Sequence, residues 1–150
     1  DRGLFIEFFP KEKPPWIGFF SGFSSSIMNP NGCYPAPDSN FCIVLSYGTG
    51  YLFNPNNLES LIIHPEKEIS SIKSFISEKL VVISGRYFIS VVNENNEIVY
   101  KYDQRLYETI NPKRVENGKL IGVCDFYPTD GPPTIELFNF DIFTGEIAFG

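Results

Sequence analysis

The side chains that most often carry out acid–base chemistry are scarce in this sequence. Histidine occurs once, as His64, at the end of an apolar run and directly before a proline. A histidine base needs a partner that orients it, and a histidine metal site usually needs a second ligand of the same kind. The G-x-S-x-G turn that presents a serine nucleophile does not occur in the sequence. We therefore interpret His64 as a structural or solvent-exposed residue.

Two pairs of carboxylates have a spacing that would suit a general acid and a general base. Glu66 and Glu68 form one pair, and Glu94 and Glu97 form the other. A glycosidase keeps the pKa values of such a pair apart, which usually requires burial. Both pairs lie in polar, turn-like sequence, so we interpret them as solvated surface. The stretch 93–97 lacks the glycine and the closing spacing of a calcium loop and is predicted to be a hairpin turn.

The cysteines and glycines add no site of their own. Cys33, Cys42 and Cys124 are odd in number and show no C-x-x-C spacing, which fits neither a disulfide framework nor a zinc site. A Cys33–Cys42 bridge across the proline-rich loop is an open alternative to reduced thiols in the cytoplasm. Gly48-Thr49-Gly50 is followed by no Lys-Ser or Lys-Thr pair, so no phosphate site is expected. We predict no catalytic residue, no metal and no cofactor. The protein is therefore predicted not to be an enzyme, with an enzyme of scattered carboxylates as the minor alternative.

The charge balance points to the kind of partner. The formal net charge is −6, and the densest basic stretches, 11–13 and 113–114, are short. Nucleic-acid binding needs a basic stripe, so we expect no direct contact with DNA or RNA. An acidic surface suits a basic protein partner, although it also serves solubility. No apolar run reaches the roughly 18 residues of a membrane helix, and no signal peptide is recognised, so we expect a cytoplasmic protein without a membrane contact.

The elements that would position these residues are predicted to be β-strands. The sequence has 15 Phe and 8 Tyr but only two Ala, a composition typical of pleated, half-buried strands. From residue 41 onwards, short apolar runs alternate with turn signals rich in Gly, Asn and Pro. Residues 1–40 form an irregular aromatic-rich segment with strands at 4–9 and 16–23 and a long loop at 29–40. A helix at 65–75 is the alternative to a strand there. We predict a single all-β domain over residues 1–150.

A quasi-repeat organises the strands of residues 41–150. Three segments, 52–59, 91–98 and 140–147, each combine an apolar run, an Asn or Asp, a polar turn and a second apolar run. They begin about 40 and then nearly 50 residues apart, close to the length of a propeller blade. Each is predicted to be the outer hairpin of a four-stranded meander, and the clearest units are 72–102 and 115–149. The chain holds about two and a half such units, whereas a closed propeller has about four or more.

The expected architecture is therefore a set of antiparallel meanders of hairpins with propeller-blade-like quasi-repeats. The sheets would pack as a compact layered or a partial-propeller domain. In this arrangement the N-terminal aromatic segment, with Trp16, Phe19, Phe20 and Phe23, would cover an otherwise exposed sheet face or edge.

Residues 79–150 also carry a resemblance. The pattern begins with Leu80-Val81-Val82-Ile83 and an Ile-x-x-Val-Asn-x-x-x-Glu-Ile hairpin, and ends with Phe138-x-Phe140-Asp141-x-x-Thr144-Gly145-Glu146. It resembles small β-meander domains of bacterial proteins, some of which look like immunity proteins of toxin–immunity systems. Family members prefer Trp in the final strands, where this chain has Tyr and Phe, and residues 1–40 have no counterpart. The resemblance implies a non-enzymatic protein that sequesters a basic toxin domain, such as a nuclease. The alternative is a carbohydrate-binding or propeller-like interaction module of a larger assembly.

A cluster of tyrosines and carboxylates is the predicted partner-binding site. Tyr100 and Tyr102 share one face of a strand, because side chains alternate along it. Tyrosine is frequent in binding hot spots, and carboxylates reach towards Lys and Arg. An alternative is that these tyrosines pack between sheets with their hydroxyl groups at the rim. The predicted cluster consists of Tyr100, Tyr102, Asp103, Tyr107 and Glu108.

Overall fold

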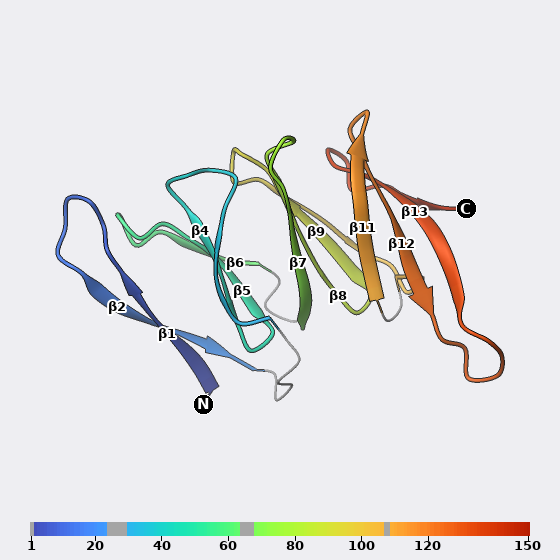
Figure 1. The fold of residues 1–150 in the computed structure, drawn as a ribbon, viewed down its shortest axis with the longest axis horizontal. Helices are drawn as coiled ribbons and strands as arrows, with labels where there is room; N and C mark the ends of the chain where they lie inside the picture. The colour runs from blue at the N-terminus through green and yellow to red at the C-terminus, as the bar shows by residue number, and fades with distance from the viewer. Residues whose placement is uncertain (1, 24–29, 64–67, 107–108) are drawn as a thin grey trace.

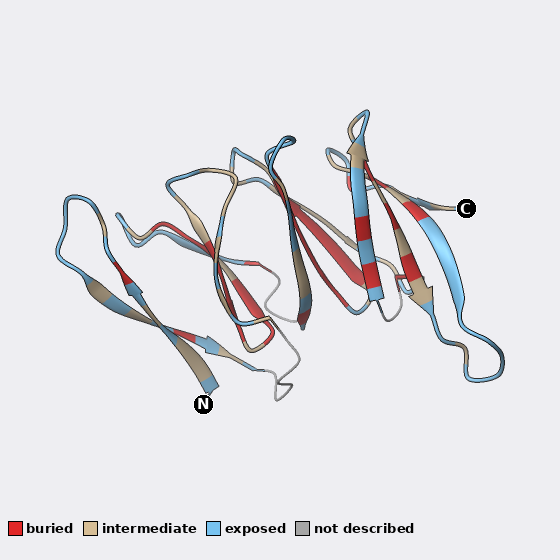
Figure 2. Ribbon diagram, in the orientation of Figure 1, coloured by how far each residue is buried: buried red, intermediate tan, exposed pale blue. Residues whose placement is uncertain are grey.

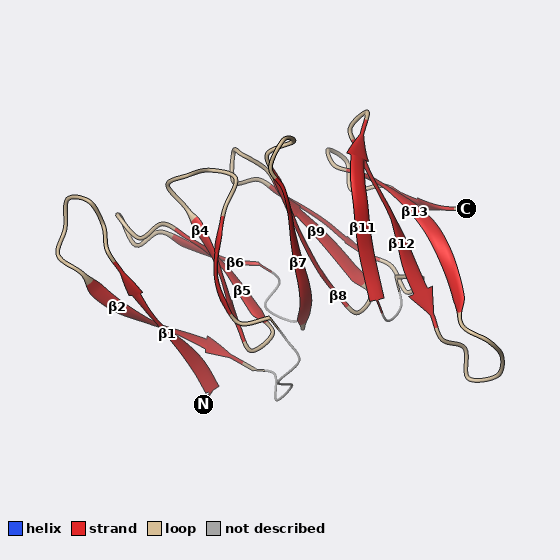
Figure 3. Ribbon diagram, in the orientation of Figure 1, coloured by secondary structure: helices blue, strands red, loops and turns tan. Residues whose placement is uncertain are grey.

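The computed structural model describes residues 2–23, 30–63, 68–106 and 109–150, and these residues form strands and loops without a helix (Figures 1 and 3). The predicted all-β class is confirmed. The stretch for which a helix was the alternative contains a strand over Ile69–Phe75, and its preceding residues 65–67 lie outside the described part. β-Branched residues such as Ile69 and Ile72 favour this extended conformation.

The strands form a hairpin followed by three four-stranded antiparallel sheets, each ordered as in the sequence. The layers follow one another along the long axis, from the N-terminal hairpin to the sheet that contains the C-terminus (Figure 1). The hairpin consists of β1 (Arg2–Phe8) and β2 (Trp16–Gly22). The sheets are β3 (Gly32–Pro35), β4 (Cys42–Ser46), β5 (Thr49–Phe53) and β6 (Ser60–Ile63); β7 (Ile69–Phe75), β8 (Leu80–Gly85), β9 (Phe88–Val92) and β10 (Ile98–Tyr102); and β11 (Thr109–Glu116), β12 (Lys119–Phe126), β13 (Thr134–Asp141) and β14 (Ile147–Phe149).

The first meander is more complete than the sequence predicted. The clear units at 72–102 and 115–149 correspond to the second and third sheets. Strand β3, however, lies inside the segment 29–40 that was predicted to be a loop, and it pairs with β4 from Gly32 opposite Leu45 to Pro35 opposite Cys42. An edge strand tolerates a proline, because one of its sides needs no backbone donor. The described part therefore holds three full sheets and one hairpin instead of about two and a half units.

The quasi-repeat marks the same turn in every sheet, the one between the third and fourth strands. In each turn an Asn or Asp accepts a hydrogen bond at its side-chain oxygen from the backbone N–H two residues later, which favours a tight corner. A residue with positive φ then reverses the chain. The side-chain bonds join Asn54 to Asn56, Asn93 to Asn95 and Asp141 to Phe143, all at 2.9 Å, and the residues with positive φ are Leu58, Asn96 and Gly145. The predicted outer hairpins are thus confirmed.

Three apolar cores join successive layers. Figure 2 shows stretches of buried residues along the strands of these layers. The first joins the hairpin to the β3–β6 sheet, the second joins β3–β6 to β7–β10, and the third joins β7–β10 to β11–β14. Neighbours on a strand point to opposite faces, so Val81 enters the second core and Val82 the third. The β3–β6 sheet and the β7–β10 sheet are consequently covered on both faces.

The N-terminal hairpin covers one face of the β3–β6 sheet, as predicted, and Trp16 and Phe20 contribute to this cover. Phe19 and Phe23, which were expected to cover it as well, are instead 51% and 55% exposed. Phe8 and Phe20 pack with Val44 and Phe53 in the first core. Two side-chain hydrogen bonds fix the hairpin further. Ser46 donates to the carbonyl of Phe20 at 2.7 Å, and Tyr51 donates to the carbonyl of Ser21 at 2.8 Å.

Candidate protein-binding surfaces

Tyr100 and Tyr102 lie on the same face of β10, as predicted. In the pairing with β9, Tyr100 is opposite Ser90 and Tyr102 is opposite Phe88. The ring of Tyr100 packs against the second core, with its centroid 6.0 Å from that of Phe88. Tyr102 is 41% exposed, and its ring meets that of Tyr87 edge-on at 6.0 Å. The packing alternative therefore describes Tyr100, whereas Tyr102 presents an accessible ring.

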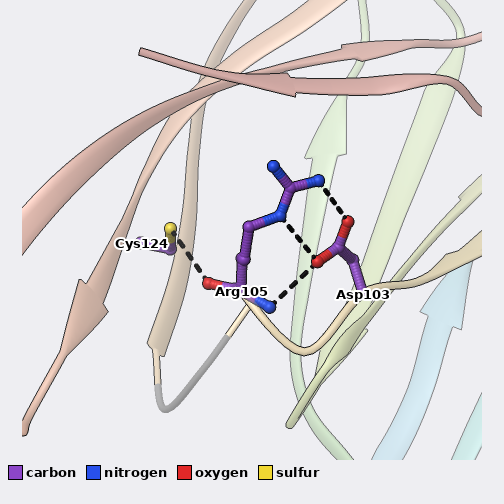
Figure 4. Close-up of polar contacts among 3 residues, drawn as sticks. All are labelled: Asp103, Arg105 and Cys124. Carbon is purple, nitrogen blue, oxygen red and sulfur yellow. Dashed lines mark hydrogen bonds and ion pairs between the residues drawn. The ribbon is translucent and has the colours of Figure 1, made fainter.

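Asp103 is paired within its own turn (Figure 4). Its carboxylate accepts hydrogen bonds from Nε and Nη2 of Arg105 at 3.0 and 2.7 Å, and from the Arg105 backbone N–H at 2.9 Å. These bonds, led by those of the guanidinium group, lower the pKa of Asp103. Only 14% of its side chain is exposed. Its negative charge is therefore largely neutralised by Arg105 and is less available to a partner.

The Asp103 turn is a structural corner between the second and third sheets. The guanidinium of Arg105 lies over the ring of Phe149, 4.2 Å from its centroid. The Cys124 thiol donates to the carbonyl of Arg105 at 3.8 Å, and burial raises the pKa of this thiol to about 11 (Figure 4). Leu106, next in the chain, is fully buried in the third core. Tyr107 and Glu108, the other members of the predicted cluster, lie outside the described residues.

The remaining acidic pairs have surface roles where the structure describes them. Glu94 forms an ion pair with Lys79 at 2.6 Å, and Glu97 accepts a hydrogen bond from Asn93 at 2.7 Å. His64 and Glu66 fall outside the described residues. Within the described ranges, no group of three or more His, Cys, Asp and Glu side chains could hold a metal ion, and no helix could cross a membrane.

The outer faces of the two end layers carry exposed apolar side chains that the sequence analysis did not single out. On β13, Ile135 is 71% and Leu137 is 53% exposed, and Leu137 lies opposite half-buried Val123 of β12. On the hairpin, Phe5 lies opposite Phe19, and their ring centroids are 4.9 Å apart. We call these surfaces the C-terminal face (Ile121, Val123, Ile135, Leu137) and the N-terminal face (Phe5, Ile17, Phe19).

A sequence signal for these faces exists in the strands themselves. The middle strands β8 and β9 are apolar at consecutive positions, which is typical of strands buried on both faces. Strand β12 shares this pattern, with Ile121 and Val123 on one face and Leu120 and Cys124 on the other, and Leu137 and Phe138 are consecutive apolar residues of β13. Only the face towards the third core is covered. The apolar residues on the other face of this sheet, such as Ile135 and Leu137, are therefore exposed.

No protein-family model matches the chain, and no curated protein matches it significantly. Two kinds of surface are available for a partner. One is the ring of Tyr102 beside Tyr87, and the other is the pair of apolar end faces.

Proposed function

We propose that this chain is a non-enzymatic protein-binding module of a larger propeller-like assembly, and that its partner packs on the C-terminal face. The observation that carries the proposal is the exposure of Ile135 and Leu137 on a sheet whose other face is closed by fully buried Phe138 and Phe140. Contiguous exposed apolar surface in a protein typically marks an interaction site.

The energetics support an apolar partner. Covering the C-terminal face would remove aliphatic surface from water, at about 25 cal/mol per Å². The three internal cores are all contacts between a sheet or hairpin and the next sheet. Aligned sheets pack about 10 Å apart with interdigitated side chains. A partner with an apolar β-sheet face would therefore continue the packing that already joins the layers of this chain.

The test compares Leu137→Asp with Ile76→Asp. Both positions are exposed, at 53% and 88%, but Ile76 lies in the turn between β7 and β8, away from the C-terminal face. We expect Leu137→Asp to abolish association, either with the natural partner or between copies of the chain. Ile76→Asp should leave the same association unchanged. Sedimentation of the purified proteins measures both results. Equal loss in both variants, or unchanged association of Leu137→Asp, would contradict the proposal.

A second candidate function is the sequestration of a basic toxin domain by an immunity-type protein. The net charge of −6 favours this function, because complementary potentials accelerate encounter with a basic protein. Among the described members of the predicted cluster, Tyr102 is the best placed to contact a partner, since its ring is accessible and Asp103 is already paired.

The product of a neighbouring gene, if it is a basic toxin, provides the test of the second function. We expect its binding to weaken as salt is raised, because salt screens exposed charges. Tyr102→Ala should also weaken the binding of the toxin, whereas Leu137→Asp should leave this binding unchanged. Binding that depends on Leu137 but not on Tyr102 or salt would favour the assembly module instead.

A further inference from the structure

Strand β3 brings two cysteines onto one face of the first sheet. In the β3–β4 pairing, Cys33 lies opposite Val44, and Pro35 lies opposite Cys42. Opposite residues of an antiparallel pair share a face, and so do alternate residues of one strand. Cys33 and Cys42 are therefore diagonal neighbours on the same face. The sequence left a Cys33–Cys42 bridge open as an alternative, and the β3–β4 pairing places the two residues near each other.

The two thiols contact each other and are chemically unequal. They are joined by a hydrogen bond, which lowers the pKa of Cys33 and raises that of Cys42. Cys33 is exposed, whereas Cys42 is half-buried and packs against the first core. An accessible thiol with a lowered pKa beside a shielded thiol is the usual arrangement of an attacking and a resolving cysteine.

We propose that Cys33 and Cys42 form a reversible dithiol–disulfide site whose oxidant is a low-molecular-weight disulfide. The Cys33 thiolate attacks one sulfur of that disulfide, forming a mixed disulfide and releasing the other half as a thiol that takes up the Cys33 proton. Cys42 then loses its proton and attacks the sulfur of Cys33, which releases the second half as a thiol. The two protein thiols are oxidised, and one small disulfide is reduced to two thiols.

The position of β3 allows the bridge to close. Diagonal residues lie further apart than directly opposite ones, so bridging requires a small movement of one strand. Strand β3 has four residues, and among the described strands it pairs with β4 alone. A short edge strand followed by the proline-containing segment 35–37 can make this adjustment, while β4 is held between β3 and β5.

The bridge would close the corner formed by residues 34–41. This corner faces the second sheet, since Asn96 donates a hydrogen bond to Asp38 at 2.9 Å. Pro35, Ala36 and Pro37 also line a cleft of about 410 Å³ with Phe75 and Leu80. Oxidation would therefore fix the wall of this cleft. Cys124 serves as an internal reference, because it is buried in the third sheet and its thiol donates to two backbone carbonyls.

The experiment treats the reduced, folded protein with oxidised glutathione, blocks remaining thiols with an alkylating agent and maps the peptides by mass spectrometry. We expect a Cys33–Cys42 cross-link and an alkylated Cys124. Cys42→Ser should stop at the glutathione adduct of Cys33, Cys33→Ser should resist oxidation, and Cys124→Ser should behave as the unchanged protein. Three alkylated cysteines, a persistent adduct in the unchanged protein, or intermolecular cross-links would overturn the proposal.

A second measurement tests the closure of the corner. The bridge should raise the Tm by roughly 5–10 °C, as expected for a short closed loop in a domain of this size. Amide hydrogen exchange over residues 36–41 should slow on oxidation, with no change over residues 127–133, a loop of the third sheet. A bridge that forms without slower exchange in 36–41 would overturn the link to the cleft.

Discussion

The second and third sheets are built alike but are covered differently. Strands β8 and β9 carry apolar residues on both faces, and their side chains Val81, Val82 and Ile89 are at most 3% exposed. Strand β13 also has apolar residues on both faces near its centre, yet Leu137 is 53% exposed while its neighbour Phe138 is fully buried. The position of a sheet in the stack, more than its composition, therefore decides whether an apolar face is core or surface.

The largest expected effect tests this difference with the same substitution in the two sheets. Ile83 is fully buried in the second core, and Ile135 is 71% exposed on the C-terminal face. Ile83→Ala should lower the free energy of unfolding by about 2–5 kcal/mol, because it leaves a cavity. Ile135→Ala should change it by less than about 0.5 kcal/mol. Urea unfolding followed by circular dichroism measures both values. A similar loss for the two variants would show that the C-terminal face is already covered in solution, for example by self-association.

The next prediction uses the equivalent turns of the two sheets, which differ in their titration. Asn93 and Asp141 occupy the same position, but only Asp141 can be protonated. Backbone hydrogen bonds from Thr144 and Phe143 lower the pKa of Asp141 below its ordinary value of 3.8. Its carboxylate therefore stabilises the folded state above that value, and this contribution is lost as the pH falls through the lowered pKa.

We expect Asp141→Asn to lower the Tm at neutral pH and to make it less sensitive to acid, so that the two proteins converge as the pH falls below about 4. Calorimetry across an acid pH series measures the difference. Asp38 and Asp103, whose pKa values are lowered by hydrogen bonds from Asn40 and Arg105, titrate in both proteins and provide the common background. Identical pH profiles would show that the Asp141 turn does not depend on its charge.

Features of the fold that depend on a short local pattern could be predicted from the sequence, whereas features that depend on contacts between strands could not. The turns at Asn54, Asn93 and Asp141 were predictable, because a short local pattern determines an Asx hydrogen bond and a reversal of the chain. The shared face of Tyr100 and Tyr102 follows from strand periodicity alone. Strand β3 was missed because Pro35 and the surrounding Pro, Asn and Gly are typical of loops, whereas its formation depends on the edge of β4.

The site residues show a second limit. Asp103 and Arg105 are two positions apart, but composition does not reveal that their side chains form a forked pair that is further held by Phe149. Phe149 comes from β14, far along the chain, so the contact depends on how the third sheet is placed. The exposure of Ile135 is likewise a property of the stack. Local patterns predicted the hairpins, and the order and number of layers determined the surfaces.

The smallest expected effect concerns the two ion pairs of the second sheet. The pair of Asp103 and Arg105 is forked, and the carboxylate is 14% exposed. The pair of Lys79 and Glu94 is single, with side chains 63% and 51% exposed. Lys79→Ala should lower the free energy of unfolding only slightly, because solvent and salt screen an exposed pair and two long side chains lose freedom in forming it. The difference should vanish in high salt, as unfolding curves at low and high ionic strength can measure. A larger effect that persists in high salt would contradict this prediction. It would mean that the aliphatic part of Lys79 stabilises the fold by packing along the cleft that it lines with Phe75 and Leu80.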